Sequence, residues 1–105
     1  MVIFFNVVAV RSYLLRNGFV YTLRKRRKHI GLTQAVYGNY YKKYFVCNAL
    51  VEELHAVKRA DQLQPYHKHS GLTCSVSQWL SLAKRLSKTD DIWLYKVTRM
   101  PQLGR

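Results

Sequence analysis

Five cations stand in an unbroken run, Arg24-Lys25-Arg26-Arg27-Lys28. Such a run repels itself in water, and it is stabilised when phosphates neutralise it. The guanidinium groups can also fork onto a phosphate and stack on a base. The run therefore predicts contact with the backbone of a nucleic acid. The plainer interpretations are a solvated loop or a nuclear localisation signal.

A second group of residues combines tyrosines with lysines between positions 37 and 44. Proteins that bind single strands place aromatic rings beside a cationic track, because every base has a face that can stack. We therefore expect nucleic-acid contacts from Tyr40, Lys42 and Lys43, and further phosphate contacts from Lys84 and Arg85. The alternative is that alternate tyrosines pack in the core and the rest form ordinary cross-strand pairs, and we expect at least two of them to be core residues.

The groups that could support catalysis are fewer. Histidine is a common general acid and base, and with neighbouring cations His67 and His69 could act in these roles in metal-independent RNA cleavage. Two histidines on an irregular loop, even with Cys74 nearby, seldom bind a metal without an acid. Glu52 and Glu53 are adjacent in a predicted strand and face opposite sides, so they cannot converge on a metal. We predict no metal and no cofactor.

Charge is the most informative property of the composition. Eighteen Lys and Arg oppose five Asp and Glu, which gives a formal net charge of +13. A field of this size attracts polyanions, and phosphate backbones are the most abundant polyanions in a cell. An acidic membrane or protein partner is a second interpretation, and a charge that serves only solubility is a third.

The 105 residues fit a single domain, 1–105, with a short flexible tail from about residue 100. Cys47 and Cys74 suit free thiols in a reducing cytosol. The apolar start, residues 1–10, is far shorter than the roughly 20 residues of a membrane span. It also lacks the basic region and cleavage site of a signal peptide. We therefore expect a cytoplasmic protein without a membrane span, as a monomer or weak dimer.

The periodicity of apolar residues predicts the elements that position these groups. Residues 2–8 read as a strand buried on both faces, and a helix over 9–16 ends at Asn17-Gly18. Further strands are predicted over 19–24, 33–37, 40–57 and 92–98, with a two-residue hairpin turn at Gly38-Asn39 and a bulge near Asn48 or in Glu52-Glu53. A helical turn is expected over 61–66, and a capped helix over 75–86 carries an apolar stripe from Val76 to Leu86.

Three segments in this order resemble the PUA-like superfamily, and within it the ASCH-type domains. The first is Leu14-Leu15-Arg16-Asn17-Gly18 followed by Tyr21-Thr22-Leu23-Arg24, where the family has a helix ending in Gly and then a Thr-x-Arg strand. The second is the long strand over 44–57. The third is Gly71-Leu72, then Ser75-x-x-x-Trp79-Leu80, then the closing strand over 93–97.

The resemblance implies an α+β fold, a small mixed β-barrel of about five strands with two to three short helices. It also implies binding of RNA or a modified nucleotide in a cleft beside the strand that carries Thr22 and Arg24. Hydrolase-type members have a Lys shortly before that Thr and a Glu before the later helix. Here the corresponding stretches read Phe19-Val20-Tyr21 and Gly71-Leu72-Thr73-Cys74, which lack both residues.

The first functional hypothesis is therefore a nucleic-acid-binding module, with RNA favoured over DNA and with Thr22 and Arg24 on the floor of the cleft. The alternative is a metal-independent ribonuclease or nucleoside hydrolase that uses Thr22, Arg24, His67 and His69 in the same cleft. A third hypothesis is an assembly partner that uses the tyrosine-rich hairpin as an adhesive sheet edge.

Overall fold

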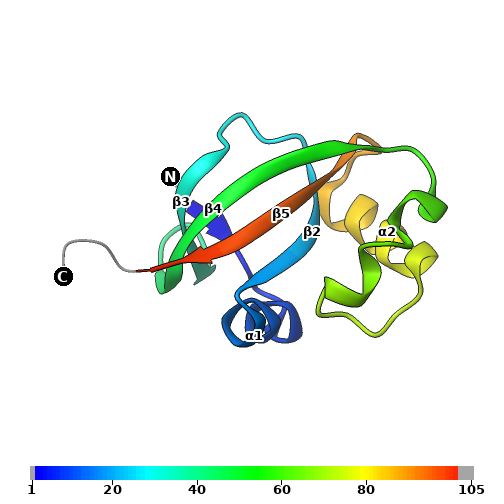
Figure 1. Ribbon diagram of the computed structural model, residues 1–105. Helices are drawn as coiled ribbons and strands as arrows, with labels where there is room; N and C mark the ends of the chain where they lie inside the picture. Colours follow the sequence, from blue (N-terminus) through cyan, green and yellow to red (C-terminus); the bar gives the residue numbers. More distant parts are fainter. Residues whose placement is uncertain (1, 102–105) are drawn as a thin grey trace.

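The protein folds as one curled, five-stranded sheet with two helices, and the computed structural model describes residues 2–101. The strand order is β1-β3-β4-β5-β2, so β1 and β2 are the two edges (Figure 1). β1 runs parallel to β3, and all other neighbours are antiparallel. The strands are β1 (Val2–Phe4), β2 (Phe19–Lys25), β3 (Gly31–Gly38), β4 (Lys43–Val57) and β5 (Ile92–Met100). The sheet forms a half-barrel whose two edge strands do not pair with each other.

The two helices begin and end where local sequence signals predict. Helix α1 (Val8–Asn17) ends at Gly18, which adopts the left-handed conformation (φ 84°) and donates its N–H to the Leu14 carbonyl. Helix α2 (Val76–Ser87) begins after Ser75, whose side chain forms a capping box with Gln78. Two short 3₁₀ helices, η1 (Ala60–Leu63) and η2 (His67–His69), connect β4 to α2.

Two hydrophobic clusters lie on the two faces of the sheet. Helix α1 packs with one through Val10 and Leu14, and helix α2 packs with the other through Trp79, Leu80 and Ala83. Successive side chains of a strand point to opposite faces. Tyr95 and Val97 of β5 accordingly belong to the α1 cluster, and Ile92 and Leu94 to the α2 cluster. β5 is therefore buried on both sides, and the sheet is the common wall of both cores.

The first strand is shorter than the apolar pattern predicts, so the expectation of a buried strand over 2–8 is wrong in its second half. The strand ends at Phe4, while Val7 and Val8 are exposed. Asn6 lies at the break, and its side chain exchanges two hydrogen bonds with the backbone of Gly38 (2.8 and 2.9 Å). An Asn side chain that binds backbone groups in this way favours a turn over a continued strand.

The β3–β4 hairpin also differs from the prediction. Its turn contains four residues, 39–42, instead of the two residues Gly38-Asn39, and β4 begins at Lys43 instead of at residue 40. The reason is the Asn39 side chain, whose Oδ1 accepts hydrogen bonds from the backbone N–H groups of Tyr41 and Lys42 (2.9 Å each). These bonds hold the two residues outside the strand ladder. The expectation that at least two of the tyrosines at 37, 40, 41 and 44 are core residues is also wrong. None of the four is buried, and Tyr37 and Tyr44 form a cross-strand pair.

Further along the chain, a bulge was predicted near Asn48 or in Glu52-Glu53, and β4 has register shifts close to both places, between Phe45 and Cys47 and between Glu53 and His55. The apolar stripe of α2 is confirmed for Trp79, Leu80 and Ala83, but Leu86 is 66% exposed. β5 remains paired through Met100, where the tail was expected to begin, and the rest of that tail, residues 102–105, lies outside the described residues.

Candidate nucleic-acid interface

A cleft of about 350 Å³ lies beside the open edge of β2. One wall is the segment from β1 into α1, and the opposite wall is the inner side of α2. The lining residues are Phe4, Phe5, Asn6, Val7, Val10, Tyr21, Thr22, Leu23, Arg24, Ser70, Leu72, Trp79, Leu82, Ala83, Leu86 and Ser87. Thr22 and Arg24, predicted from the sequence to share a cleft, do line it together.

Arg24 spans the gap between the two edge strands. Its Nη2 donates to the Phe4 carbonyl of β1 (2.6 Å), and its Nε donates to Thr22 Oγ1 (3.2 Å). The guanidinium carbon lies 5.0 Å from the centre of the Phe5 ring. Loss of hydration lowers the pKa of Arg24 to about 10, with a smaller contribution from the positive charge of Arg27. Arg24 therefore remains charged at neutral pH, and its donors already face β1.

Two further arginines bind carbonyls in the same region. Arg27 Nη2 donates to the Val2 carbonyl (3.2 Å), and Arg11 Nη1 donates to the Phe5 carbonyl (3.0 Å). We name Arg11, Arg24 and Arg27 the arginine clasp. Along β1, the backbone groups of successive residues point alternately toward β3 and away from it. The carbonyls of Val2 and Phe4 point away from β3 and lie on the free edge of the strand. Guanidinium groups thus hold that edge where a closed barrel would have backbone hydrogen bonds.

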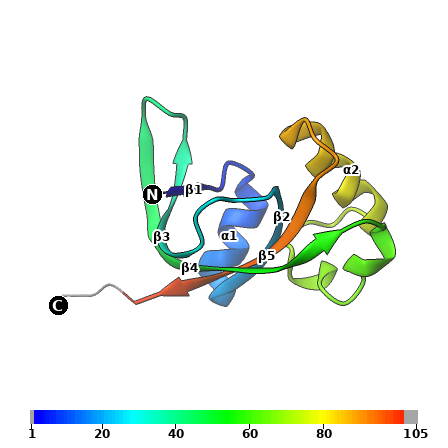
Figure 2. The ribbon, with the colours of Figure 1, turned by 90° about the horizontal axis from the view of Figure 1, so that it is seen from above.

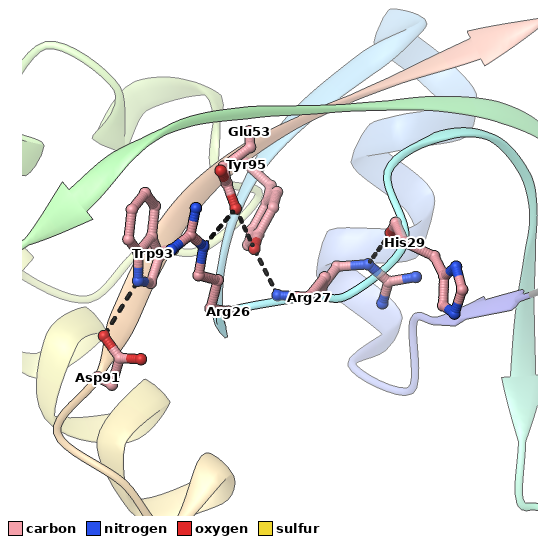
Figure 3. A network of polar contacts seen from close by, with 7 residues as sticks. All are labelled: Arg26, Arg27, His29, Glu53, Asp91, Trp93 and Tyr95. Carbon is pink, nitrogen blue, oxygen red and sulfur yellow. Dashed lines mark hydrogen bonds and ion pairs between the residues drawn. The ribbon is translucent and has the colours of Figure 1, made fainter.

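The middle of the basic run is held by a polar network (Figure 3). The hydroxyl of the fully buried Tyr95 accepts from the Arg27 backbone N–H (2.7 Å) and donates to Glu53 Oε1 (3.1 Å). Arg26 Nε lies 3.4 Å from the same carboxylate oxygen, and its guanidinium lies 4.3 Å from the Trp93 ring centre. Burial is the main cause of the raised pKa of Tyr95. The loop after β2 is therefore fastened to β4 and β5.

The five cations of the run consequently have different surroundings. Arg24 and Arg27 are half-buried, and Arg26 is exposed but paired with Glu53. Lys25 and Lys28 are exposed on the surface. Of the run, Arg24 lines the cleft, and much of the hydrogen-bonding capacity of Arg24 and Arg27 is directed to backbone carbonyls of β1.

The two histidines considered for catalysis do not line the cleft. The Nδ1 of His69 lies 2.6 Å from the Tyr13 hydroxyl, and its ring lies 5.0 Å from the ring of Phe19. The His67 ring packs against Trp79 with ring centroids 5.8 Å apart. Its Nε2 atom is buried and has no hydrogen-bond partner among residues 2–101. Both belong to aromatic packing around η2, so the structure does not bring them to Thr22 and Arg24.

The remaining predicted contacts lie on two projections. Lys84 and Arg85 are in the last turn of α2, next to the cleft residues Leu86 and Ser87. Lys42 and Lys43 are at the turn of the β3–β4 hairpin. Figure 2 shows the hairpin and the C-terminal end of α2 projecting on the same side of the molecule, with β1 between them.

Sequence reasoning missed several residues of the cleft wall. Phe4, Phe5 and Trp79 appeared only as core positions, and Ser70 appeared only as part of a polar loop, although it is buried and hydrogen-bonded to His67 and Leu72. The polar Asn6 inside an apolar run was the one signal that the chain turns there. No sequence pattern marked the other residues as part of a cleft wall, because a residue lines the cleft only where a sheet edge stays unpaired.

Within the described residues, no helix is long and apolar enough to cross a membrane. No group of three or more His, Cys, Asp or Glu in that part of the chain is arranged to hold a metal ion. Both cysteines of the chain, Cys47 and Cys74, are free thiols. Comparison of the chain with protein-family models, with curated proteins and with solved structures gave no significant match.

Proposed function

We propose that this protein is a nucleic-acid-binding module, with RNA as its ligand, and that the cleft beside β2 accepts one unpaired base. One observation carries the proposal: Thr22 and Arg24 supply polar groups to a cleft otherwise rich in aromatic and aliphatic side chains. A base has apolar faces and a polar edge, and RNA-binding modules recognise both. The volume of about 350 Å³ falls within the range of small-ligand sites.

The charge distribution supports the same proposal. Among the described residues, no Asp, Glu or Lys belongs to the cleft lining, and Lys25, Lys84 and Arg85 are adjacent in sequence to residues that line it. Phosphates on either side of an inserted base would meet Lys25 and Lys28 from the loop after β2, and Lys84 and Arg85 from α2. The Thr22 hydroxyl accepts from Arg24 Nε and keeps its own proton for a ligand acceptor. The resemblance to PUA-like, ASCH-type domains belongs to this proposal, since the Thr-x-Arg residues are those of the cleft floor.

We propose binding instead of hydrolysis in this cleft. General acid–base catalysis needs titrating groups within hydrogen-bond reach of the reacting atoms. His67 and His69 are outside the lining, and no carboxylate is part of it. No observation on the described residues favours the ribonuclease or nucleoside hydrolase alternative over binding.

A steric test of the cleft uses two serines of α2. Ser87 lines the cleft, whereas Ser81 is exposed on the same helix and does not. We expect Ser87→Trp to weaken binding of a labelled single-stranded RNA at least about tenfold, since loss of one stacked base costs roughly 1–3 kcal/mol. Ser81→Trp adds the same bulk without changing affinity. Thr22→Val, which keeps the volume and removes the hydroxyl, should weaken binding to a smaller extent.

Salt dependence tests the electrostatic part. For a ligand neutralised by several cations, affinity falls steeply between about 50 and 200 mM salt. Wild-type protein without salt-dependent RNA affinity would contradict the proposed function altogether. Equal affinities for wild type, Ser87→Trp and Ser81→Trp would instead show that RNA binds elsewhere on the surface.

A further inference from the structure

Two aromatic rings stand unprotected at the β3–β4 turn. Tyr41 is 96% exposed and Tyr40 is 79% exposed, at the end of the hairpin arm in Figure 2. We call residues 39–43 the hairpin tip. Large rings displayed on a projecting turn contribute nothing to a core, and exposed aromatic residues are typical of recognition surfaces.

The hairpin tip is rigidly built. Asn39 Oδ1 binds the backbone N–H groups of Tyr41 and Lys42, and the Asn39 N–H donates to the Lys42 carbonyl (3.0 Å). Gly38 has φ +113°, and a Cβ at that position would lie 2.2 Å from the Lys42 carbonyl oxygen. Lys43 Nζ donates to the Tyr40 carbonyl (2.7 Å). The backbone that carries the two rings is thus held in one conformation, which lowers the ordering cost of binding.

Below the tip, a second pair of tyrosines already has both charge and ring partners. Tyr37 and Tyr44 stack on each other with centroids 4.9 Å apart and planes 20° from parallel. Arg11 lies 4.1 Å from the Tyr37 centroid, and Lys42 lies 5.5 Å from the Tyr44 centroid. This pair therefore stiffens the neck of the hairpin. The Tyr40 and Tyr41 rings meet edge to face, with centroids 5.9 Å apart and planes 79° apart, and Lys43 Nζ lies 4.8 Å from the Tyr40 centroid. Because Tyr40 is 79% and Tyr41 is 96% exposed, ring surface on both remains accessible to a ligand.

We propose that the hairpin tip is a second contact for nucleic acid, in which unpaired bases stack on Tyr40 and Tyr41 while Lys42 and Lys43 neutralise the neighbouring phosphates. The inference rests on the proposed function and adds a selectivity, because bases inside a duplex cannot reach exposed rings. The tip is therefore the element that makes the protein prefer single strands. No acidic residue precedes Glu52 in the sequence, so no carboxylate from residues 1–51 can oppose phosphates at the hairpin.

A nucleic acid fits the tip better than a membrane surface does. Residues 39–43 read Asn-Tyr-Tyr-Lys-Lys and contain no aliphatic side chain that could enter the acyl region. Base stacking, in contrast, needs only flat ring faces beside a cationic track. The geometry of the tip supplies both.

The hairpin and the cleft are also joined by one residue. Asn6 lines the cleft, and the same side chain holds the backbone of Gly38 at the neck of the hairpin. When one base of a single strand occupies the cleft, other bases of the same strand are kept close to the tip and can stack there. Two linked contacts of this kind raise the overall affinity without a tight individual site.

The test compares a single-stranded RNA of about 12 nucleotides with a blunt duplex of the same sequence, both labelled and measured by fluorescence anisotropy. The double variant Tyr40→Ala/Tyr41→Ala removes both rings without changing the net charge. We expect its affinity for the single strand to fall about 5- to 30-fold. Its affinity for the duplex should stay at the wild-type value. Tyr40→Phe/Tyr41→Phe keeps the rings, and this control should keep the wild-type preference.

Three outcomes would overturn the inference. The alanine variant could bind the single strand as tightly as wild type, or it could lose single-strand and duplex affinity equally. Wild type could also bind vesicles of anionic phospholipid through the two tyrosines while showing no preference between the RNAs. Each of these leaves the proposed function intact if Ser87→Trp still weakens RNA binding, whereas absence of any RNA affinity in wild type removes both proposals.

Discussion

The basic run and the hairpin tip look alike in the sequence, yet the fold uses them differently. Both are short cation-rich segments close to aromatic residues, and neither contains an acid. In the run, Arg24 and Arg27 direct their donors to the carbonyls of β1, and Arg26 pairs with Glu53. At the tip, the lysines and the two outer tyrosines face solvent. A count of cations therefore overstates the charge available to a ligand wherever guanidinium groups also satisfy backbone carbonyls.

The largest effect in this comparison should come from removing the central member of the arginine clasp. We expect Arg24→Met to lower the free energy of unfolding by about 2–3 kcal/mol, because a charged hydrogen bond is lost and the Phe4 carbonyl loses its partner. Urea denaturation at neutral pH measures the change. Lys28→Met, in the same run but exposed, is the matched control and should change stability by less than about 0.5 kcal/mol. Equal effects of the two variants would show that Arg24 does not fasten the half-barrel.

A smaller effect should follow from loosening the loop after β2. Tyr95→Phe removes the acceptor for the Arg27 N–H and the donor to Glu53, which should lower the free energy of unfolding by about 1–2 kcal/mol at neutral pH. Because the pKa of Tyr95 is raised in the folded state, the folded protein holds this proton more tightly than the unfolded chain does. Its contribution is thus present below the ordinary tyrosine pKa of 10.0 and is lost as the pH rises above that value.

Denaturation of wild type and Tyr95→Phe on both sides of pH 10 checks the direction of this pH dependence. The alkaline loss of stability should be smaller in the variant, since it lacks this titrating group. A variant that loses stability with the same pH dependence as wild type would show that the Tyr95 hydroxyl titrates alike in the folded and unfolded chains.

The smallest effect on stability should come from the exposed lysines of the run. Lys25→Ala/Lys28→Ala should change the free energy of unfolding by less than about 0.5 kcal/mol. If both lysines contact phosphates, the slope of log K against log salt for single-stranded RNA should become shallower by about 1.4, or about 0.7 for each contact. An unchanged slope would place the phosphate track elsewhere, on the hairpin or on α2.

Local sequence patterns predicted most of the elements of the fold. The Gly18 end of α1 and the Ser75 capping box depend on interactions between residues close in sequence. The errors fell where one side chain binds backbone far away or in the next turn. Asn6 ends the first strand by binding Gly38, and Asn39 enlarges the hairpin turn. Neither bond is visible in the apolar periodicity.

The candidate site was predicted in part. The neighbourhood of Thr22 and Arg24 followed from their spacing on one strand, since residues two apart share a face. The sequence by itself also determined the strong positive charge and the aromatic hairpin, because both are properties of residue types and order.

Only the tertiary structure decided which of these groups are available. In the folded protein the edges of β1 and β2 stay apart, and the cleft lies beside them. Three arginines bind the unpaired carbonyls of β1 and of Phe5, the residue after β1. The fold also packed His67 and His69 against aromatic rings and left Tyr40 and Tyr41 in solvent. The physical reason is that a strand edge, a carbonyl or a ring face is free or occupied according to partners distant in sequence, and residue spacing along the chain does not specify them.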